Sequence, residues 1–573
     1  MPTMESPIYM NTLQAWEGKL GNPEVAGPLS FAAASQRDER EEFPREPLAR
    51  LGELGLPALL VPVSRGGQME SLEQMLAASY AVGRRDPTVA LAAGLPMWSH
   101  LAWMAGTPAQ QDRVRSIVLG NGSLCLAASE AEHGADLLSC GCRAEENGQG
   151  YELTGEKWPI GCARTCRAAF VLARMGPARG PRALSWFLVD EDALRRPACR
   201  RLSQIPMLGL RGADLGGLAF DGLELGSDGM LGAPGAGFDL ALKLFQLTRP
   251  LVAGLSLGPG DTALRLAADF ALHRGLYGGL ATELPTVRRA LVRAWLDFQI
   301  AEVLLVSSLR GAHVSPERLS VGSQVAKIVA PMLVRRAIEQ AAQVLGARFF
   351  FRNHAQGMFQ KVYRDQSIAA TLDGSTDVCL QTLAAQLPSL LAQRGSASSS
   401  LLVSQCAVGQ PVPPLAYPRL GLSAHGTDGV LDGLDGVIRG ASHDVEETRT
   451  LGLLQEQIEA GRRRLADTVE AWRGSEGARS PMLADAAAEY CAFYALGLCM
   501  ASGICNRAEP LMLRRCSWLR LAGYRLLNGP MAGAPSEMKL VDELFDELRA
   551  RLDRNDLLSA YTRSYQGPKP ALP

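Results

Sequence analysis

The period of the apolar residues changes twice along this chain, and those changes limit the folds that it can adopt. Up to about residue 121 the apolar residues recur at helical spacing, as in EPLARLGELGLPALLVP. From 122 to 235 the apolar stretches are short or alternating, as in GYELTGEKW and AAFVLARM, and turn signals such as ENGQG separate them. From 236 the helical period returns. The sequence therefore predicts a helical segment, a β segment and a second helical segment.

The second helical segment contains the longest periodic pattern, QVAKIVAPMLVRRAIEQAAQVLG, which predicts a helix that Pro331 kinks and Gly346 ends. The composition changes after residue 394, where GSASSS and GQPVPPLAYPRLG predict an extended linker over residues 395–440. Beyond it, DVEETRTLGLLQEQIEAGRRRLADTVEAW and SEMKLVDELFDELRARL predict an additional helical domain at 441–573. A length of 573 residues is sufficient for three or four domains.

The charge and the cysteines exclude several classes of protein. A net charge of −1 provides no overall field that would favour nucleic acid or an anionic membrane. The twelve cysteines show neither metal-ligand spacing nor a secreted disulfide framework, so we expect buried, reduced thiols, no metal site and a cytoplasmic protein. The N-terminus MPTMESPIYM lacks the regions of a signal peptide.

One apolar segment, 484–505, is long enough to span a bilayer. It carries Asp485 and Glu489 and is rich in alanine and glycine. We therefore interpret it as a buried helix of a bundle and expect no transmembrane segment. Attachment to a membrane surface is the alternative.

Motifs in all three segments resemble the acyl-CoA dehydrogenase family. They are ELGLPALLVPVSRGG and AGTPAQQDR, then CLAASEAEHGAD, YELTGEKW and LGLRGADLGGLAFDGLEL, then LTRP, ADFALHRGLYGG, QVAKIVA and YRDQSIAATLDGST. The resemblance spans about the first 390 residues, and the tail loosely resembles that of the very-long-chain branch. It implies an α+β protein with an N-terminal helical domain (1–121), a central β-barrel or β-sandwich domain (122–235), a C-terminal four-helix-bundle domain (236–394) and the extra helical domain.

The resemblance implies a catalytic base at Asp373, in TLDGSTD, where the family has a glutamate followed by Gly and Thr. The aspartate is one methylene shorter, and a loss of reach of about 1 Å lowers a rate by on the order of a hundredfold unless the backbone shifts. The related nitroalkane oxidases use an aspartate at this position. A turn aspartate without chemistry is the alternative. Arg249 matches an arginine that orients the surroundings of the base, and Thr248 leaves no base at the family's other base position.

The resemblance also implies a set of FAD contacts. Ser129, in SEAEHGAD, supplies a hydroxyl to the flavin, and Arg274 reaches the pyrophosphate of a flavin that is bound mainly by the neighbouring subunit. A guanidinium suits a diphosphate because it donates two parallel hydrogen bonds. The implied cofactor-binding residues are Ser129, Gly134, Arg274, Tyr277, Gln343, Gly346, Ser375 and Asp377.

The chain departs from the family pattern at the flavin wall. Pro159 stands where the family has a tryptophan that covers the flavin, and Gly161 stands where it has a threonine. Trp158 is one residue early, and a step of one residue along a strand points to the opposite face unless a bulge turns the side chain. Ala347 and Phe349 replace glycines near the pyrophosphate.

The interpretation that fits these residues best is an FAD-dependent α,β-dehydrogenase of acyl thioesters, acyl-CoA or acyl carrier protein (acyl-ACP). Asp373 would remove the α proton, the flavin N5 would accept the β hydride, and an electron-transfer flavoprotein or oxygen would reoxidise the flavin. Fatty acid metabolism or polyketide tailoring is the expected context. A flavin-free isomerase or dehydratase, or a pseudoenzyme partner, is the alternative. A homodimer is expected because the implied pyrophosphate arginine acts across a subunit interface.

Overall fold

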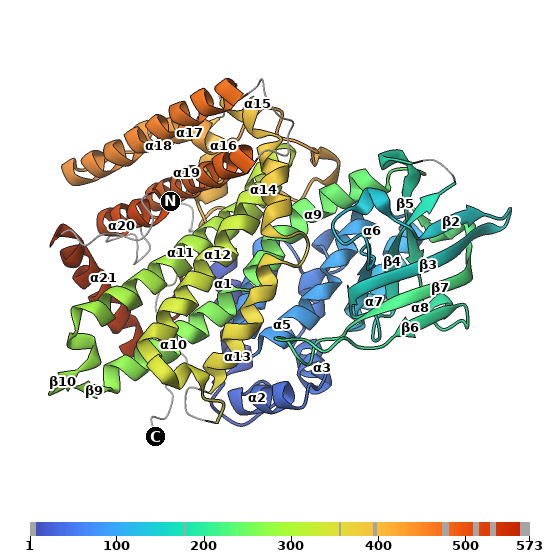
Figure 1. Cartoon of the computed structure of the whole chain (residues 1–573), viewed down its shortest axis with the longest axis horizontal. Coiled ribbons are helices and arrows are strands. Elements are labelled where there is room, and N and C mark those ends of the chain that lie inside the picture. The colour runs from blue at the N-terminus through green and yellow to red at the C-terminus, as the bar shows by residue number, and fades with distance from the viewer. Residues whose placement is uncertain are drawn as a thin grey trace. The chain divides into compact units, whose positions relative to one another are not determined.

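The computed structural model describes residues 7–176, 179–353, 357–392, 398–472, 481–507, 515–527 and 535–561. The chain forms two compact units (Figure 1). The mixed unit comprises Ala32–Glu70 and Thr88–Thr248, and the helical unit comprises Met1–Phe31, Ser71–Pro87 and Arg249–Pro573. The N-terminal segment predicted as one helical domain is thus divided between the two units, because α1 (Ile8–Leu20) and α4 (Leu72–Gly83) pack on each other within the helical unit.

The mixed unit contains an eight-stranded sheet with the order β6-β7-β3-β2-β4-β5-β8, and β1 pairs with β4. Most neighbours are antiparallel, but β1 and β2 both run parallel to β4. The strands are β1 Leu124–Ala127, β2 Arg143–Glu146, β3 Gly150–Gly161, β4 Ala168–Met175, β5 Leu184–Val189, β6 Cys199–Leu202, β7 Leu215–Gly226 and β8 Met230–Leu231.

Residue patterns explain the central strands of this sheet. In β3, Tyr151 and Leu153 are buried and Glu152 and Thr154 are exposed, which is the alternation of a strand with one covered face. Every residue of β5 is buried, as expected for a continuous apolar run. The turn predicted at ENGQG joins β2 to β3, where Gly148 adopts φ 79°.

Short helices complete the mixed unit. Gly55, at φ 88°, separates α3 from the following 3-10 turn, where the sequence predicts a break. Thr107 caps α7, and its hydroxyl accepts a hydrogen bond from the Gln110 N–H. The helices are α2 Phe31–Glu39, α3 Arg45–Glu53, η1 Leu56–Leu60, η2 Val63–Arg65, α5 Pro87–Gly94, η3 Leu95–Ser99, α6 His100–Ala105, α7 Pro108–Leu119 and α8 Glu191–Leu194, with η4 Leu137–Ser139, η5 Pro181–Ala183 and η6 Ser227–Gly229.

Helix α9 (Gly237–Gly254) leads into the helical unit, whose centre is formed by α10, α11 and α12 packed side by side (Figure 1). Helix α12 continues through Pro331 and ends before Gly346, which has a positive φ of 58°. The helical elements up to residue 392 are α1 Ile8–Leu20, α4 Leu72–Gly83, α10 Leu257–His273, α11 Pro285–Val314, α12 Leu319–Leu345, α13 Met358–Asp365, α14 Thr376–Ala384 and α15 Leu387–Ala392, with η7 Ala281–Glu283, η8 Pro316–Arg318, η9 Gly346–Phe350 and η10 Gln366–Ala370. A hairpin of β9 (Gly275–Leu276) and β10 (Gly279–Leu280) follows α10.

The described part of 395–440 differs from the extended linker that its composition predicts. It contains α16 (Ser399–Cys406), η11 (Tyr417–Arg419) and α17 (Leu431–Arg439), and α16 packs on α11, α17 and α19. Leu402, Cys406 and Val408 are buried. The apolar residues among the prolines and serines therefore hold this segment against the bundle, although 411–416 has no regular secondary structure, as its prolines lead one to expect.

Four further helices extend the helical unit: α18 Val445–Trp472, α19 Pro481–Cys505, α20 Arg515–Leu527 and α21 Pro535–Asp553. They pack on the core helix α11 or on one another (Figure 1). Two helical stretches, Gly237–His273 and Pro481–Cys505, are long and apolar enough to cross a membrane by length and composition. In α19, 78% of the apolar window is buried inside the structure, which agrees with the interpretation as a bundle helix.

Candidate functional site

Asp373 lies in the turn between η10 and α14. Its backbone is left-handed, with φ 66°, and Gly374 follows at φ 102°. Aspartate tolerates this region better than most residues, and glycine adopts it without cost. Ser375 then caps α14 by accepting a hydrogen bond from the Val378 N–H at 3.4 Å. The Asp-Gly-Ser sequence therefore sets the chain reversal that presents a half-buried carboxylate.

Arg249, on α9, lies against this turn as the sequence predicts. Its Nε donates to the Asp373 carbonyl oxygen at 3.1 Å, and its side chain is buried. A Cβ at residue 374 would come within 3.2 Å of Arg249 Nη2, so the guanidinium would have to move by a few tenths of an ångström, and the φ of 102° favours glycine as well. The base position and the arginine are thus brought together.

Lys327, on α12, is a third member of the cluster, and sequence reasoning did not single it out. It has no exposed surface, and its Nζ donates to the carbonyl oxygens of Ala369 at 2.5 Å and Leu372 at 2.6 Å. Burial lowers the pKa of Lys327 to about 8, and the nearby Asp373 carboxylate opposes that shift. The sequence does contain an indication of this role: Lys327 lies inside the apolar run QVAKIVA, and a charge buried there needs a partner.

The two predicted adenosine contacts on α14 have different environments. The Ser375 hydroxyl already accepts the capping hydrogen bond, although a hydroxyl can still donate one. Asp377 is exposed in the first turn of the helix.

In the mixed unit, Ser129 lies just after β1 and is half-buried. Its carbonyl oxygen accepts a hydrogen bond from the Trp158 N–H at 3.0 Å, which ties the loop to β3. The adjacent Glu130 is 2.7 Å from the buried Lys157 ammonium. Burial raises the pKa of Glu130, but Lys157 and two backbone N–H groups outweigh burial and lower it to about 2. Gly134 is on the exposed part of the same loop.

Strand β3 contains a bulge at the position where the family pattern is broken. Lys157 pairs with Leu218 and Ile160 with Gly216, so Trp158 and Pro159 together oppose the single residue Gly217. A Cβ on Gly217 would lie 3.1 Å from Trp158 Cδ1, so the indole lies against the backbone of β7. The bulge required to turn Trp158 is therefore present.

The two substituted positions of the flavin wall, Pro159 and Gly161, leave space around them. Pro159 is exposed. A Cβ on Gly161 would meet only Leu95, at 3.4 Å, which is ordinary contact. Thr248, at the other base position of the family, is fully buried, and its hydroxyl donates to Leu244 O at 3.3 Å.

The remaining predicted cofactor residues lie away from Asp373. Lys327 and Gln343 are sixteen positions apart on α12, about 24 Å along the helix axis. Gln343 and Gly346 are exposed at the end of α12, and Arg274 and Tyr277 are exposed beside and within the β9–β10 hairpin. Tyr277 is 92% exposed. Within one chain these four residues do not join the Asp373 cluster.

Phe349, at one of the replaced glycine positions, belongs to an aromatic group on η9 and α13. Its ring centroid lies 4.3 Å from that of Phe350, 5.5 Å from that of Tyr363 and 6.3 Å from that of Phe359. Ala347, at the other replaced position, is exposed. The turn that glycines keep open in the family is thus partly filled by rings here.

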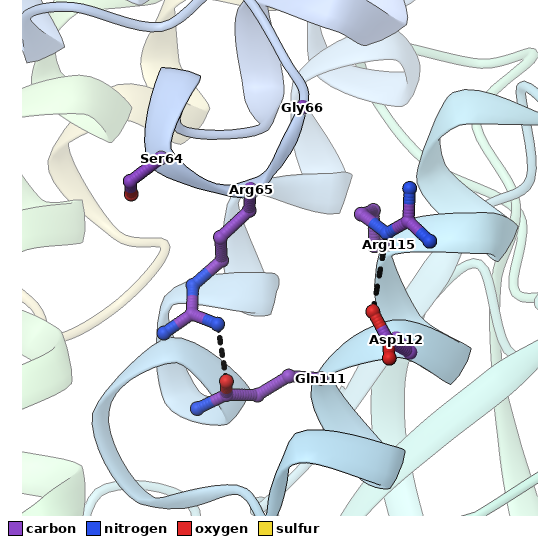
Figure 2. A pocket seen from close by; sticks show the side chains of 6 residues that line it. All are labelled: Ser64, Arg65, Gly66, Gln111, Asp112 and Arg115. Carbon is purple, nitrogen blue, oxygen red and sulfur yellow. Dashed lines mark hydrogen bonds and ion pairs between the residues drawn. The ribbon is translucent and has the colours of Figure 1, made fainter.

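A hollow of about 280 Å³ lies elsewhere on the mixed unit, between η2 and α7 (Figure 2). Figure 2 shows the guanidinium of Arg65 donating to the Gln111 side chain, and Arg115 paired with Asp112 at 3.4 Å. Its charged side chains thus interact with one another, and none of the predicted site residues lines it.

Comparison with known proteins identifies the family. The models of the N-terminal, middle and C-terminal domains of acyl-CoA dehydrogenase match residues 30–116, 125–223 and 235–387. The chain belongs to the acyl-CoA dehydrogenase family. The members of this family are oxidoreductases that act on CH–CH bonds, and they bind FAD.

Individual relatives are distant. The human mitochondrial short-chain specific acyl-CoA dehydrogenase is 26% identical over 362 residues, which are 62% of this chain and 86% of that protein. Butyryl-CoA dehydrogenase from Megasphaera elsdenii superposes with a TM-score of 0.61 at 20% identity, over 67% of this chain and 98% of that one. The prolyl acyl carrier protein oxidase AnaB gives 0.57 at 18% identity, over 65% and 95%. These similarities confirm the expected fold, with α18–α21 beyond the part that the family models match.

The residues present fit FAD in most respects. Within the described part of the chain, the exposed Arg274 guanidinium makes no hydrogen bond or ion pair and is thus available to a diphosphate. Gly346 keeps a positive φ, and a Cβ at this position would meet no atom within 4 Å. Strand β3 has a bulge at Trp158, the aromatic residue next to the substituted position 159, as a re-aimed side chain would require. The rings around Phe349, and the substituted positions Pro159, Gly161 and Ala347, depart from the expected cradle.

Proposed function

We propose that this family member is an FAD-dependent α,β-dehydrogenase of acyl thioesters in which Asp373 is the α-proton base. The observation that carries the proposal is the Asp373 turn, where a half-buried carboxylate lies beside the buried side chains of Arg249 and Lys327. Cations near a carboxylate favour its ionised form, which is the form that accepts a proton.

In the proposed reaction a carboxylate oxygen of Asp373 takes the α proton of the acyl group. FAD, when bound, supplies the acceptor for the β hydride. Arg249 holds the turn through the Asp373 carbonyl oxygen, so the carboxylate is presented by a fixed backbone. Ser129 and the β3 bulge would hold the flavin ring, and Arg274, Gln343 and Gly346 the pyrophosphate.

The carrier, the electron acceptor and the assembly are parts of the same proposal. CoA and an acyl carrier protein are both candidate carriers, and an electron-transfer flavoprotein or oxygen is the candidate acceptor, in fatty acid metabolism or polyketide tailoring. A homodimer is supported by the separation of about 24 Å along α12 between Lys327 and the predicted pyrophosphate contact Gln343 in one chain, because a second copy would complete the site. The buried cysteines, which form no disulfide among the described residues, support a cytoplasmic location. Light scattering should give twice 61.3 kDa for the dimer.

The test begins with the visible spectrum of the purified protein, with and without added FAD. Flavin bands at one per chain, and their anaerobic bleaching by acyl-CoA or acyl-ACP, are the expected results. Asp373→Asn should keep the bands and slow the bleaching by about 10²–10⁴-fold. Asp485→Asn is the matched control, because it alters an exposed carboxylate on α19 that is none of the predicted site residues, and it should leave the bleaching rate unchanged.

One observation favours the alternative, a protein of this fold without redox activity. The aromatic group around Phe349 occupies a turn where glycines let the cofactor approach. If the protein neither contains nor takes up FAD, the dehydrogenase proposal fails, and a flavin-free isomerase, dehydratase or non-catalytic partner becomes the better description.

A further inference from the structure

Lys327 stands out among the buried charged groups because its ammonium lies within the turn that carries the proposed base. Its two carbonyl partners, Ala369 and Leu372, belong to the end of η10 and to the residue just before Asp373. Carbonyl groups at a helix end have no partner within the helix, and a cation is their best partner. The ammonium thus replaces helical hydrogen bonds at the point where the chain reverses.

The charges around Lys327 come from three other elements. Asp373 in the turn raises the pKa of Lys327, whereas Arg249 on α9 lowers it, and burial has the largest effect. Cys379 on α14 faces the same cluster, and burial raises the pKa of its thiol. Lys327 is therefore a cation at neutral pH and is the group of this cluster that loses its charge first as the pH rises, near pH 8.

We propose that Lys327 is a positioning residue for Asp373: it fixes the turn through two backbone carbonyls, and its positive charge keeps the carboxylate ionised. In the reaction the proton passes from the α carbon to Asp373, while Lys327 keeps its own protons and does not contact the substrate. This inference rests on the proposed role of Asp373 and extends it to a regulating charge.

The positioning role of Lys327 predicts how the rate of flavin bleaching depends on pH. A carboxylate base alone gives a rate that rises with pH and then stays constant. Above about pH 8 Lys327 loses its charge, and its hydrogen bonds to the two carbonyl oxygens that hold the turn become weaker. The rate of flavin bleaching by a saturating acyl thioester should therefore fall again above that pH. The wild-type profile should therefore be bell-shaped.

Three variants separate this role from a structural one. Lys327→Arg keeps the charge above pH 8 and should remove the alkaline limb. Lys327→Met removes the charge at every pH; it should slow bleaching at least about tenfold and also lack the alkaline limb. Cys379→Ala is the matched control, since it removes the other titrating group of the cluster, and it should retain the alkaline limb. An alkaline limb that survives in Lys327→Met, or that disappears in Cys379→Ala, overturns the proposal.

A second measurement needs neither flavin nor substrate. In protein labelled with [4-13C]aspartate, the Asp373 carboxyl resonance is assigned by its absence from Asp373→Asn and titrated by NMR. In Lys327→Met its titration midpoint should rise by about one unit or more, because an opposite charge has been removed. An unchanged midpoint in a folded variant overturns the inference. If the wild-type protein does not react with thioesters, the proposed function fails, but this titration still decides the role of Lys327.

Discussion

Arg310 of α11 joins the core of the helical unit to the segment that composition alone predicts as a linker. Its side chain has no exposed surface, and its Nη1 is 2.8 Å from Oε1 of the equally buried Glu73 on α4. The other guanidinium nitrogens donate to backbone carbonyls of the segment 404–410, and every one of those distances is 3.1 Å or less. The carbonyls are those of Ser404, Gln405, Ala407 and Gln410.

Arg310→Met should therefore destabilise the helical unit strongly. The substitution keeps most of the aliphatic volume but leaves the Glu73 carboxylate buried without its cation. Burial already raises the pKa of Glu73, and Arg310 is the main group that opposes it. Breaking a buried ion pair costs about 3–5 kcal/mol. Each of the four carbonyls loses a charge-assisted hydrogen bond as well, so we expect a loss of at least about 4 kcal/mol.

Urea unfolding, followed by far-ultraviolet circular dichroism, measures the loss. Arg335→Met is the matched control, because its pair with Glu339 is on the surface, with side chains 65% and 42% exposed, and should cost less than about 1 kcal/mol. The double variant Arg310→Met, Glu73→Met should recover part of the loss, since no buried charge remains. Hydrogen exchange should increase first at 404–410. A loss below about 1 kcal/mol for Arg310→Met would refute this reasoning.

Glu302, Gly374 and Lys157 provide three further tests. Burial raises the pKa of Glu302 to about 6, so between pH 4.5 and 6 the folded chain holds a proton that the unfolded chain releases. The protonated Glu302 therefore adds about 2 kcal/mol to the free energy of unfolding. This contribution is complete below pH 4.5 and is lost as the pH rises through 6. Urea midpoints between pH 4.5 and 7 should show this slope in the wild type but not in Glu302→Gln, and equal slopes would contradict it. Gly374→Ala should slow flavin bleaching far more than Gly278→Ala does. Both glycines have positive φ, but only Gly374 lies against the Arg249 guanidinium. Equal effects on the bleaching rate would show that this contact does not matter. Lys157→Met should cost about 3–5 kcal/mol by leaving Glu130 without its buried partner, and a near-neutral effect on thermal unfolding would show that the pair is dispensable.

The sequence predicted those helices, strands and turns that are determined by residue types at nearby positions. The strands predicted from GYELTGEKW and AAFVLARM are present as β3 and β4, and α12 ends where Gly346 was expected to end it. The order of helical, β and helical segments followed from the change of period alone. At the site, the Asp-Gly-Ser turn was local too, since its conformation depends on residue types at consecutive positions.

Elements that are stabilised by residues far away in the sequence could not be predicted in this way. Strand β2, with the sequence RAEE, has one buried residue and exists because β3 and β4 pair with it. The segment 395–440 has the composition of a linker, but α16 is held by Arg310 and by α19, which are far away in sequence. The bulge in β3 depends on the register with β7. The sequence therefore shows that a bulge is needed to turn Trp158, but it does not show whether the bulge is present.

The Asp373 cluster shows why the resemblance found only part of the site. Asp373 and Arg249 could be matched to family motifs because the motifs specify the side chains at these two positions. Lys327 acts through backbone carbonyls, and those carbonyls have no side-chain signature. A buried lysine in an apolar helix face nevertheless costs free energy unless an acceptor or a counter-charge compensates. The sequence thus indicates that Lys327 has partners, and the fold identifies them as the turn that presents the proposed base.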